Sequence, residues 1–305
     1  MADLTKLTHF KRLQAYGLLI LAQATVGVNI VGSKYLVASI SLLFLLTARF
    51  FIATFLLFGL HSVAGNKENT VLGYLQALTK LDWIFIVAQA LTAGVFFNFL
   101  MIWGLKYTDA NVAGIITSAL PAITAVMSWL VLKERFTFKT SLSLGFATLG
   151  LVIISLDKLS VAGSTHSFFG DLIILVALIP EAGYYVLSKW HHNRLPIFLI
   201  AAIMNGINAL ILIPVWLVYT GGHYPHLSLA QGSIVTLIGI SSGLFYVCWY
   251  SGSAKVEAAI ASLSLALMPI LTVLIAWFAL GELISGVQLI GMMMVIISIV
   301  IYVLI

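Results

Sequence analysis

The chain has 305 residues, of which 62% are hydrophobic and only 8% are charged, and its mean hydropathy is +1.13. Soluble domains carry about 25% charged residues, and one soluble core of this length cannot bury so much apolar surface. This composition excludes a soluble enzyme and a disordered or fibrous chain, and it predicts an integral membrane protein. The net charge of +5 then indicates a cytoplasmic face rather than a nucleic-acid partner, and the single Cys248 excludes a disulfide framework.

Ten apolar segments are candidates for membrane-spanning helices, each of which needs about 20 residues. They cover residues 14–33, 37–60, 83–104, 110–132, 140–156, 170–188, 197–219, 231–252, 257–279 and 284–304. Polar or Gly-containing stretches separate them, for example 61–80 and 157–166. We therefore expect an all-α integral membrane protein with ten transmembrane helices, the first of them an uncleaved span rather than a signal peptide.

The basic residues are distributed unevenly between the two sides of such a chain. If the N-terminus is cytoplasmic, that side receives eleven of the 15 Lys and Arg residues, the far side receives three, and Arg49 lies within a span. The eleven are Lys6, Lys11, Arg12, Lys67, Lys80, Lys133, Arg135, Lys139, Lys189, Arg194 and Lys255, and the three are Lys34, Lys106 and Lys158. The positive-inside rule then places both termini in the cytoplasm of a multi-pass plasma-membrane protein, in a bacterium the inner membrane.

Residues 104–134 match residues 252–282 at a constant offset of 148 positions (252 − 104). The identical pairs include Pro121/Pro269, Trp129/Trp277 and Glu134/Glu282. Matched Pro, Trp and Glu at one offset indicate a duplication, with one five-helix repeat in 1–156 and the other in 170–305. Because five is an odd number, the second repeat is inverted in the membrane. Two inverted repeats around a central cavity are typical of secondary transporters.

Several of the repeated residues are candidates for structural or gating roles. Pro121 and Pro269 lie in mid-span, where Pro kinks a helix and can provide a hinge, and Glu134 and Glu282 lie at opposite faces of the membrane. Small residues recur every four positions in both copies, as Ala110, Gly114 and Ser118 and as Ala258, Ser262 and Ala266. Such spacing favours close helix packing, either within a monomer or between the subunits of a homodimer.

Four stretches carry motifs of a known family. ALPAITAVMSWLVLKERF and ALMPILTVLIAWFALGEL each contain Pro, an apolar run and then Glu at a span end, beside the Arg-bearing TARFFIATFLLF and the later GDLIILVALIPEAGYYVLSKW. Together these stretches resemble the drug/metabolite transporter superfamily, EamA type. The resemblance implies two five-helix halves around a central cavity, and export of amino acids, metabolites or drugs. It also implies that Arg49 braces the fold or the gate.

Among the charged residues, only Arg49 and Glu181 lie deep within predicted spans. Each costs about 2.5–3.5 kcal/mol at a helix centre on insertion scales, so each should face a cavity or a partner. Glu181 is the candidate to carry a coupling proton or to pair with the ammonium group of a substrate. Its alternative role is a buried ion pair with Arg49, whose own alternative role is direct contact with the substrate.

Other polar and aromatic side chains in the spans predict a cavity for a small amphipathic solute. The candidate substrate-binding residues are Asn29, Gln89, Asn98, Tyr184, Tyr185, Tyr246, Trp249 and Tyr250, together with Glu181. In the third span, helical spacing places Gln89 and Phe96 on one side and Asn98 on another. For Tyr246, Trp249 and Tyr250 the alternative is an aromatic belt at the membrane surface.

The chain contains no GxxxxGK[ST], HExxH or GxSxG motif, so we expect neither direct ATP use nor an enzyme, and no cofactor or metal. The predicted function is secondary-active export of amino acids or similar small metabolites by alternating access, driven by protons or by the substrate's own gradient. The first alternative is efflux of cationic aromatic drugs, with Glu181 and aromatic faces binding the cation. An integral membrane enzyme and a channel are alternatives of another class. Clustered acidic or His residues would indicate the enzyme, and the kinked inverted repeats favour alternating access over the channel.

Overall fold

The computed structural model describes residues 9–64, 70–133, 138, 142, 145–146, 149, 167–191, 195–221, 225–256, 264–265 and 267–304. Within these residues, six helical stretches are long and apolar enough to cross a membrane. They are α1 (His9–Leu36), α2 (Leu42–Ala64), the stretch Lys80–Gly104, α9 (Phe168–Trp190), α10 (Ile197–Thr220) and α11 (Leu229–Ser253). Two shorter apolar helices follow, α13 (Leu267–Leu280) and α14 (Gly286–Leu304).

These helices confirm the prediction of an all-helical membrane protein with several apolar spans. Among the described residues, the helices named here occupy nine of the ten predicted segments, in whole or in part. The fifth segment, 140–156, lies largely outside the described residues, as do Glu134, the stretch 157–166 and the first part of the ninth segment. A short helix that was not predicted, α3 (Val71–Gln76), lies in the polar stretch 61–80, and the Thr70 side chain caps its first turn.

The third and fourth spans are not regular α-helices. The third consists of α4 (Lys80–Gln89), a π-helix η2 (Ala90–Phe96) and α5 (Phe97–Gly104). The fourth is divided by a 3₁₀ turn into α6 (Ala110–Ile116) and α7 (Leu120–Leu132). Pro121 lies in the first turn of α7, so the predicted interruption of this span occurs just before the proline.

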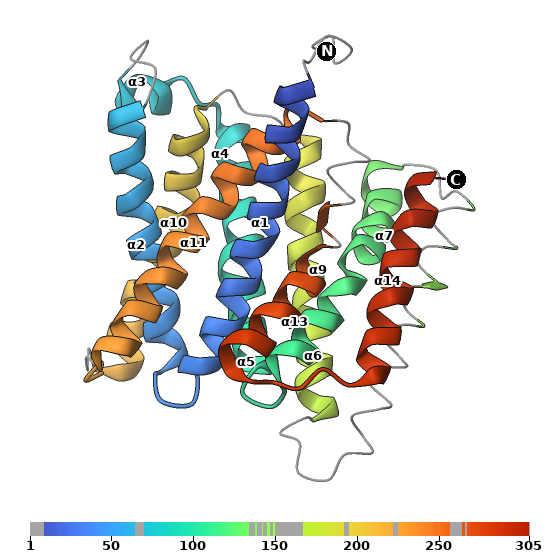
Figure 1. Cartoon of the computed structure of the whole chain (residues 1–305). Coiled ribbons are helices and arrows are strands. Elements are labelled where there is room, and N and C mark those ends of the chain that lie inside the picture. Colours follow the sequence, from blue (N-terminus) through green and yellow to red (C-terminus); the bar gives the residue numbers. More distant parts are fainter. Residues whose placement is uncertain are drawn as a thin grey trace.

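Equivalent helices of the two halves pack in equivalent ways, and each half contributes its first helix to the other half. The first helix of each half packs against the other half, α1 against α11 and α13, and α9 against α4, η2, α5 and α7. The second helices, α2 and α10, pack against each other, and so do the fourth-span helices α6 and α13. Figure 1 shows that α1 and α9 run in opposite directions. This arrangement is that of two inverted repeats.

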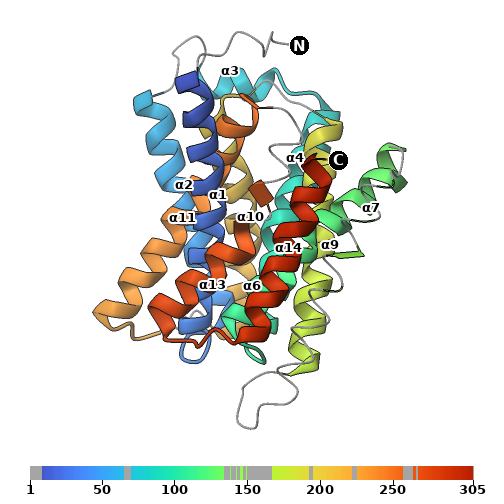
Figure 2. The same cartoon turned by 45° about the vertical axis from the view of Figure 1, so that its right-hand side comes forward.

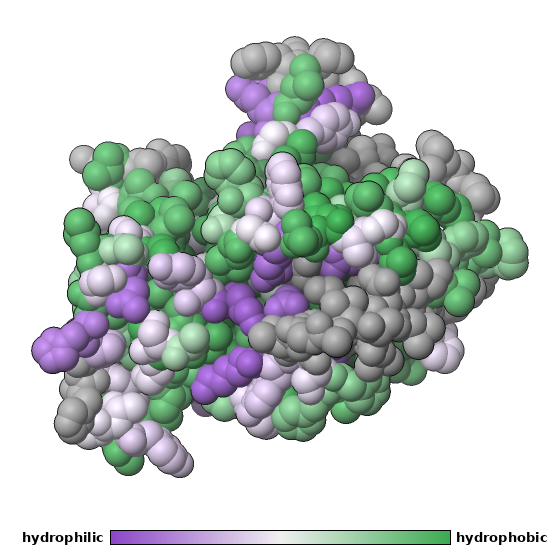
Figure 3. All heavy atoms as spheres, turned by 60° about the horizontal axis from the view of Figure 1, so that its bottom comes forward, coloured by the Kyte–Doolittle hydropathy of each residue, from purple (hydrophilic) through white to green (hydrophobic). Residues whose placement is uncertain are grey.

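The outer surface of the bundle is suited to lipid. Bulky side chains such as Trp277 and Phe278 on α13 are exposed, and α14 lies at the periphery beside α6 and α13 (Figure 2). Hydrophobic residues cover the flanks, whereas hydrophilic residues gather at the end of the bundle that faces the viewer in Figure 3. The start of α1 and the end of α14 both lie at the opposite end of the bundle (Figure 1).

Polar contacts connect helices at the end of the bundle where α1 finishes, one set within the first half and one between the halves. The Lys34 ammonium donates hydrogen bonds to the carbonyls of Thr108 and Leu105, at 2.7 and 3.2 Å. Glu282, which follows α13, accepts a hydrogen bond at 3.2 Å from the backbone N–H of Ala110 and so caps the start of α6. This contact places Glu282 at an interface between the halves.

Candidate substrate-binding site

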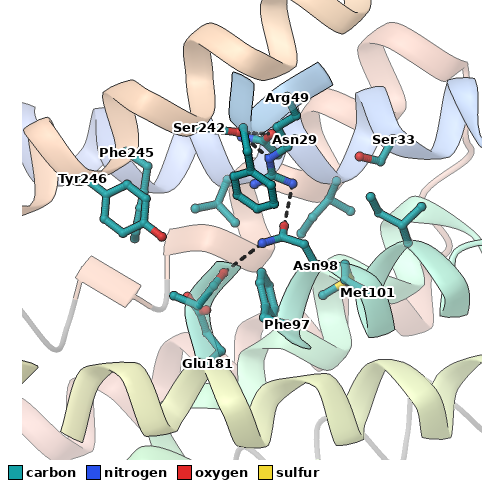
Figure 4. Close-up of a pocket in the computed structure, with 15 residues that line it drawn as sticks. Asn29, Ser33, Arg49, Phe97, Asn98, Met101, Glu181, Ser242, Phe245 and Tyr246 are labelled. Carbon is teal, nitrogen blue, oxygen red and sulfur yellow. Dashed lines mark hydrogen bonds between the residues drawn. The ribbon is translucent and has the colours of Figure 1, made fainter. Parts of the chain in front are cut away.

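A cavity lies inside the bundle where helices of both halves meet (Figure 4). Its volume is about 40 Å³. One water needs about 10–15 Å³ of such space, so the cavity accommodates about three or four waters or a small chemical group. Its polar lining residues are Asn29 and Ser33 on α1, Arg49 on α2, Asn98 on α5, Glu181 on α9, and Ser242 and Tyr246 on α11. The two charged residues predicted within the membrane therefore share one site.

The guanidinium group of Arg49 is held by neutral acceptors from other helices. Its Nε donates a hydrogen bond to Oγ of Ser242, and its Nη1 donates one to Oδ1 of Asn98 at 2.5 Å. The Ser242 hydroxyl lies 3.0 Å from Oδ1 of Asn29, and the Asn29 amide donates a hydrogen bond to Ser241 at 2.9 Å. This network fixes the orientation of a side chain that is only 8% exposed, and it links α2 to α1, α5 and α11.

The π-helix in the third span explains how the Asn98 side chain is oriented to accept a hydrogen bond from Arg49. The Nδ2 group of Asn98 donates hydrogen bonds to the carbonyls of Ala93 and Gly94, at 2.8 and 2.7 Å, both within η2. A π-helical turn disturbs the regular i→i−4 bonding and is frequently found at functional sites. Because the amide nitrogen is used in this way, the Asn98 oxygen is turned toward Arg49.

Glu181 lies on the other side of the cavity and is 5% exposed (Figure 4). The hydroxyl of Tyr185, one turn further along α9, interacts with its carboxylate. Its Oε2 atom is buried and has no hydrogen-bond partner among the described residues. No ion pair with an N–O distance within 4.0 Å joins Glu181 to Arg49, both of which the structure describes fully. Two buried ionisable side chains, one basic and one acidic, thus line one cavity without pairing directly.

The four other aromatic candidates form a cluster with Tyr246 between α9 and α11. The hydroxyl of Tyr184 lies 3.1 Å from that of Tyr250, and the ring of Tyr185 packs edge-on against Trp249 at 5.3 Å. Tyr184 also contacts Tyr246 at 5.9 Å between ring centroids. Because Tyr184, Tyr185, Trp249 and Tyr250 follow Glu181 and Tyr246 along their helices, the cluster extends from the cavity toward the end of the bundle where α9 and α11 finish (Figure 1).

The structure brings together only part of the predicted set. Asn29, Asn98, Glu181 and Tyr246 line the cavity, together with Arg49. Tyr184, Tyr185, Trp249 and Tyr250 lie next to the cavity without forming its wall. Tyr246 and Trp249 are buried inside the bundle, which does not fit a belt facing lipid, and Tyr250 is half-buried. Gln89 is buried on α4 but lies outside the cavity wall.

The predicted side of Phe96 is wrong. Phe96 is 52% exposed on the outer surface, whereas Phe97 lines the cavity. The prediction assumed about 100° per residue through the whole span, and the π-helix at 90–96 turns less per residue. Met101 and Phe245 also line the cavity and were not predicted, because apolar residues in an apolar span show no contrast that would reveal which face is buried.

The described residues contain no group of three or more His, Cys, Asp or Glu side chains that could hold a metal ion. What the cavity does offer is one cation, one carboxylate, several amide and hydroxyl groups, and apolar walls. Such a set can bind and orient a small polar solute.

Comparisons with known proteins agree with this interpretation. The sequence matches the EamA-like transporter family over residues 13–156 and 168–304. It is 27% identical to the uncharacterized transporter YetK of Bacillus subtilis (strain 168), over 94% of this chain and 86% of that relative. It is 31% identical to the uncharacterized transporter YyaM of the same organism, over 68% of each chain. One crystal structure of a protein superposes with a TM-score of 0.68 over 98% of both chains at 18% identity, which shows a shared fold.

The family match falls in two consecutive halves, in agreement with the exchanged packing of the helices. The family match covers most of the chain, and both relatives are described as transporters. The chain therefore belongs to the EamA-like transporter family, and it is a multi-pass membrane transporter of a small molecule rather than an enzyme.

Proposed function

We propose that the protein is a secondary-active exporter of amino acids or similar small metabolites that works by alternating access. The observation that carries this proposal is the buried cavity at Arg49 and Glu181, whose walls come from both halves of the chain. Movement of one inverted repeat (1–156) against the other (170–305) would expose such a site to each side of the membrane in turn. The substrate's own gradient or a proton gradient drives the cycle, with Glu181 as the proton carrier in the second case.

Efflux of cationic aromatic drugs is a second candidate because Glu181 and the rings of Phe245 and Tyr246 would attract a cation. Arg49 lies in the same cavity and opposes this function. Like charges in a medium of low dielectric constant repel strongly, so a purely cationic solute would be disfavoured. The pair of opposite charges therefore supports amino acids over cationic dyes.

Flux in liposomes distinguishes the two candidates. The purified protein, reconstituted with and without an imposed proton gradient, is expected to accelerate movement of at least one amino acid over protein-free liposomes. Cationic dyes should move no faster than in the protein-free control. Transport of dyes without transport of any amino acid would contradict the proposal and favour drug efflux. A flux that is unchanged when the proton gradient is collapsed would assign the driving force to the substrate.

We further propose that both chain termini are cytoplasmic, because the basic residues are concentrated on the side where α1 begins. Lys106, in the turn between α5 and α6, then faces outside, and Ala77, between α3 and α4, faces the cytoplasm. Both residues are exposed in the structure and accessible to reagents.

Labelling of introduced cysteines tests this orientation. In a Cys248→Ala background, an impermeant thiol reagent added to intact cells should label Lys106→Cys and leave Ala77→Cys unlabelled. Both should react after the cells are opened, which controls for accessibility. Labelling of Ala77→Cys alone in intact cells would reverse the proposed orientation.

A further inference from the structure

We propose that Arg49 is a substrate-binding residue, and that Arg49 and Glu181 together clamp a zwitterion, with its carboxylate at Arg49 and its ammonium group at Glu181. The proposal rests on the transport function proposed above and narrows its substrate class. It assigns to Arg49 a role in recognition beyond the bracing of the fold. It also predicts that the transporter rejects solutes that carry only one of the two charges.

The first observation is that the Arg49 guanidinium has donors left for a ligand. An Arg side chain has five N–H donors, and within the described part of the chain hydrogen bonds from Arg49 use only Nε and Nη1. Their acceptors, Ser242 and Asn98, are neutral. The positive charge is therefore held in a fixed orientation at the cavity wall without a carboxylate against it, and a substrate carboxylate matches the planar fork of this group.

The second observation concerns the carboxylate on the opposite wall. Oε2 of Glu181 is buried and lacks a hydrogen-bond partner among the residues described, although the cavity is next to it. The Tyr185 hydroxyl interacts with this carboxylate, but a buried carboxylate oxygen without a partner is costly, because its loss of hydration is not compensated. An ammonium group of a solute in the cavity would provide both the charge and the hydrogen-bond donors that Oε2 lacks.

The separation of the two charges supports a ligand between them. A direct ion pair would be the simplest way to bury both groups, yet they are held apart on α2 and α9 with the cavity between them (Figure 4). A zwitterion satisfies both ends at once. A simple amine would be repelled by Arg49, and a simple carboxylate by Glu181, so each charge discriminates against the wrong solute. The walls at Phe97, Met101 and Phe245 offer apolar surface to the remainder of the solute, and the cavity of about 40 Å³ must widen to admit an amino acid of that size.

Binding to the purified full-length protein in detergent tests the clamp with two matched sets of probes. One set is L-phenylalanine, 2-phenylethylamine and N-acetyl-L-phenylalanine, and the other is L-leucine, 3-methylbutylamine and N-acetyl-L-leucine. In each set the second probe lacks the carboxylate and the third lacks the ammonium group. In at least one set we expect the wild type to bind the amino acid at least about tenfold more tightly than either analogue.

The variants should relax this preference selectively. Glu181→Gln should reduce the preference for the amino acid over the N-acetyl acid, and Arg49→Gln should reduce the preference over the amine, each by about tenfold. Arg49→Lys keeps the charge but not the fork, so it should weaken amino-acid binding and still reject the amine, which serves as the test if Arg49→Gln does not fold. Lys106→Gln removes an exposed charge outside the cavity and should change nothing.

Three results would overturn the clamp: equal binding of an amino acid and its amine or N-acetyl analogue in both sets, binding of none of the six probes, or variants that weaken all probes by the same factor. Flux in liposomes separates this proposal from the proposed function. Transport of amino acids without discrimination against the analogues would overturn the clamp alone. Selective binding without transport of any solute would support the clamp and overturn the export function.

Discussion

Glu181→Gln is expected to abolish most transport while leaving the protein folded. Gln keeps the size of the side chain and its ability to bond with the Tyr185 hydroxyl, and it removes the charge. No ion pair within 4.0 Å joins Glu181 to Arg49 in the described structure, so the change does not leave the Arg49 guanidinium without an ion-pair partner. We therefore expect a thermal unfolding temperature in detergent close to that of the wild type, and a flux in liposomes reduced by at least about tenfold.

Asp82→Asn provides a matched control, since it makes the same chemical change outside the cavity. The Asp82 carboxylate completes a capping box with Thr79 and lies 2.6 Å from Nε2 of His191. Asp82→Asn removes a negative charge from the first turn of α4 and from beside His191, so it should lower the free energy of unfolding by about 0.3–1 kcal/mol and leave transport intact. Glu181→Gln should therefore lose flux and keep its stability, whereas Asp82→Asn should lose stability and keep its flux.

The opposite pattern at Glu181 would show that the residue balances Arg49 in the fold. In that case Glu181→Gln would be unstable, and combination with Arg49→Leu would restore stability by removing the stranded cation. A Glu181→Gln protein with normal stability and normal flux would contradict both roles.

The sequence was sufficient to predict the spans and their duplication because both depend on composition and order. A bilayer requires about 20 apolar residues per helix, which leaves little freedom in assigning segments such as 197–219, observed as α10 (Ile197–Thr220). The matched Pro and Glu residues of the two halves predicted the repeat, and the interruption before Pro121 follows from the missing backbone N–H of proline.

The cavity was predictable only in part. Charged groups are so costly in a membrane that Arg49 and Glu181 could be identified as residues of a cavity without coordinates. The hydrogen bonds of Arg49 with Asn98 and Ser242 depend on how α2, α5 and α11 pack against one another. The residue pattern within each helix does not determine that packing. The π-helix at 90–96 is also not apparent in the sequence, and it is the reason why Phe97, and not Phe96, faces inward.

The small residues of the fourth span illustrate the same limit. Their spacing predicted close packing but left open whether the partner was another helix of this chain or a second subunit. In the structure an added Cβ at Gly114 would lie 2.7 Å from both Cβ and Cγ2 of Thr272 on α13, so this position packs within the chain. All three small residues of the second copy lie outside the described residues, namely Ala258, Ser262 and Ala266.

Gly114→Ala is accordingly expected to destabilise the protein strongly for so small a change. Cβ of Thr272 is attached to the helix backbone and cannot rotate away, so α6 and α13 must move apart. Overpacking of this kind costs about 1–3 kcal/mol, and here it would act at a contact between the two repeats. Transport should fall together with stability, because the helices that cross at this point belong to opposite halves.

Gly59→Ala on α2 is the control, because an added Cβ there meets no atom within 4 Å. Ala is the better helix former, so Gly59→Ala should be neutral or stabilise the protein by up to about 1 kcal/mol. Thr272→Ala removes one of the two clashing atoms, Cγ2, and should restore part of the stability lost in Gly114→Ala. Thermal unfolding in detergent measures all four proteins. Equal unfolding temperatures for Gly114→Ala and Gly59→Ala would mean that the two repeats do not meet as closely at this crossing as the contact between Gly114 and Thr272 requires.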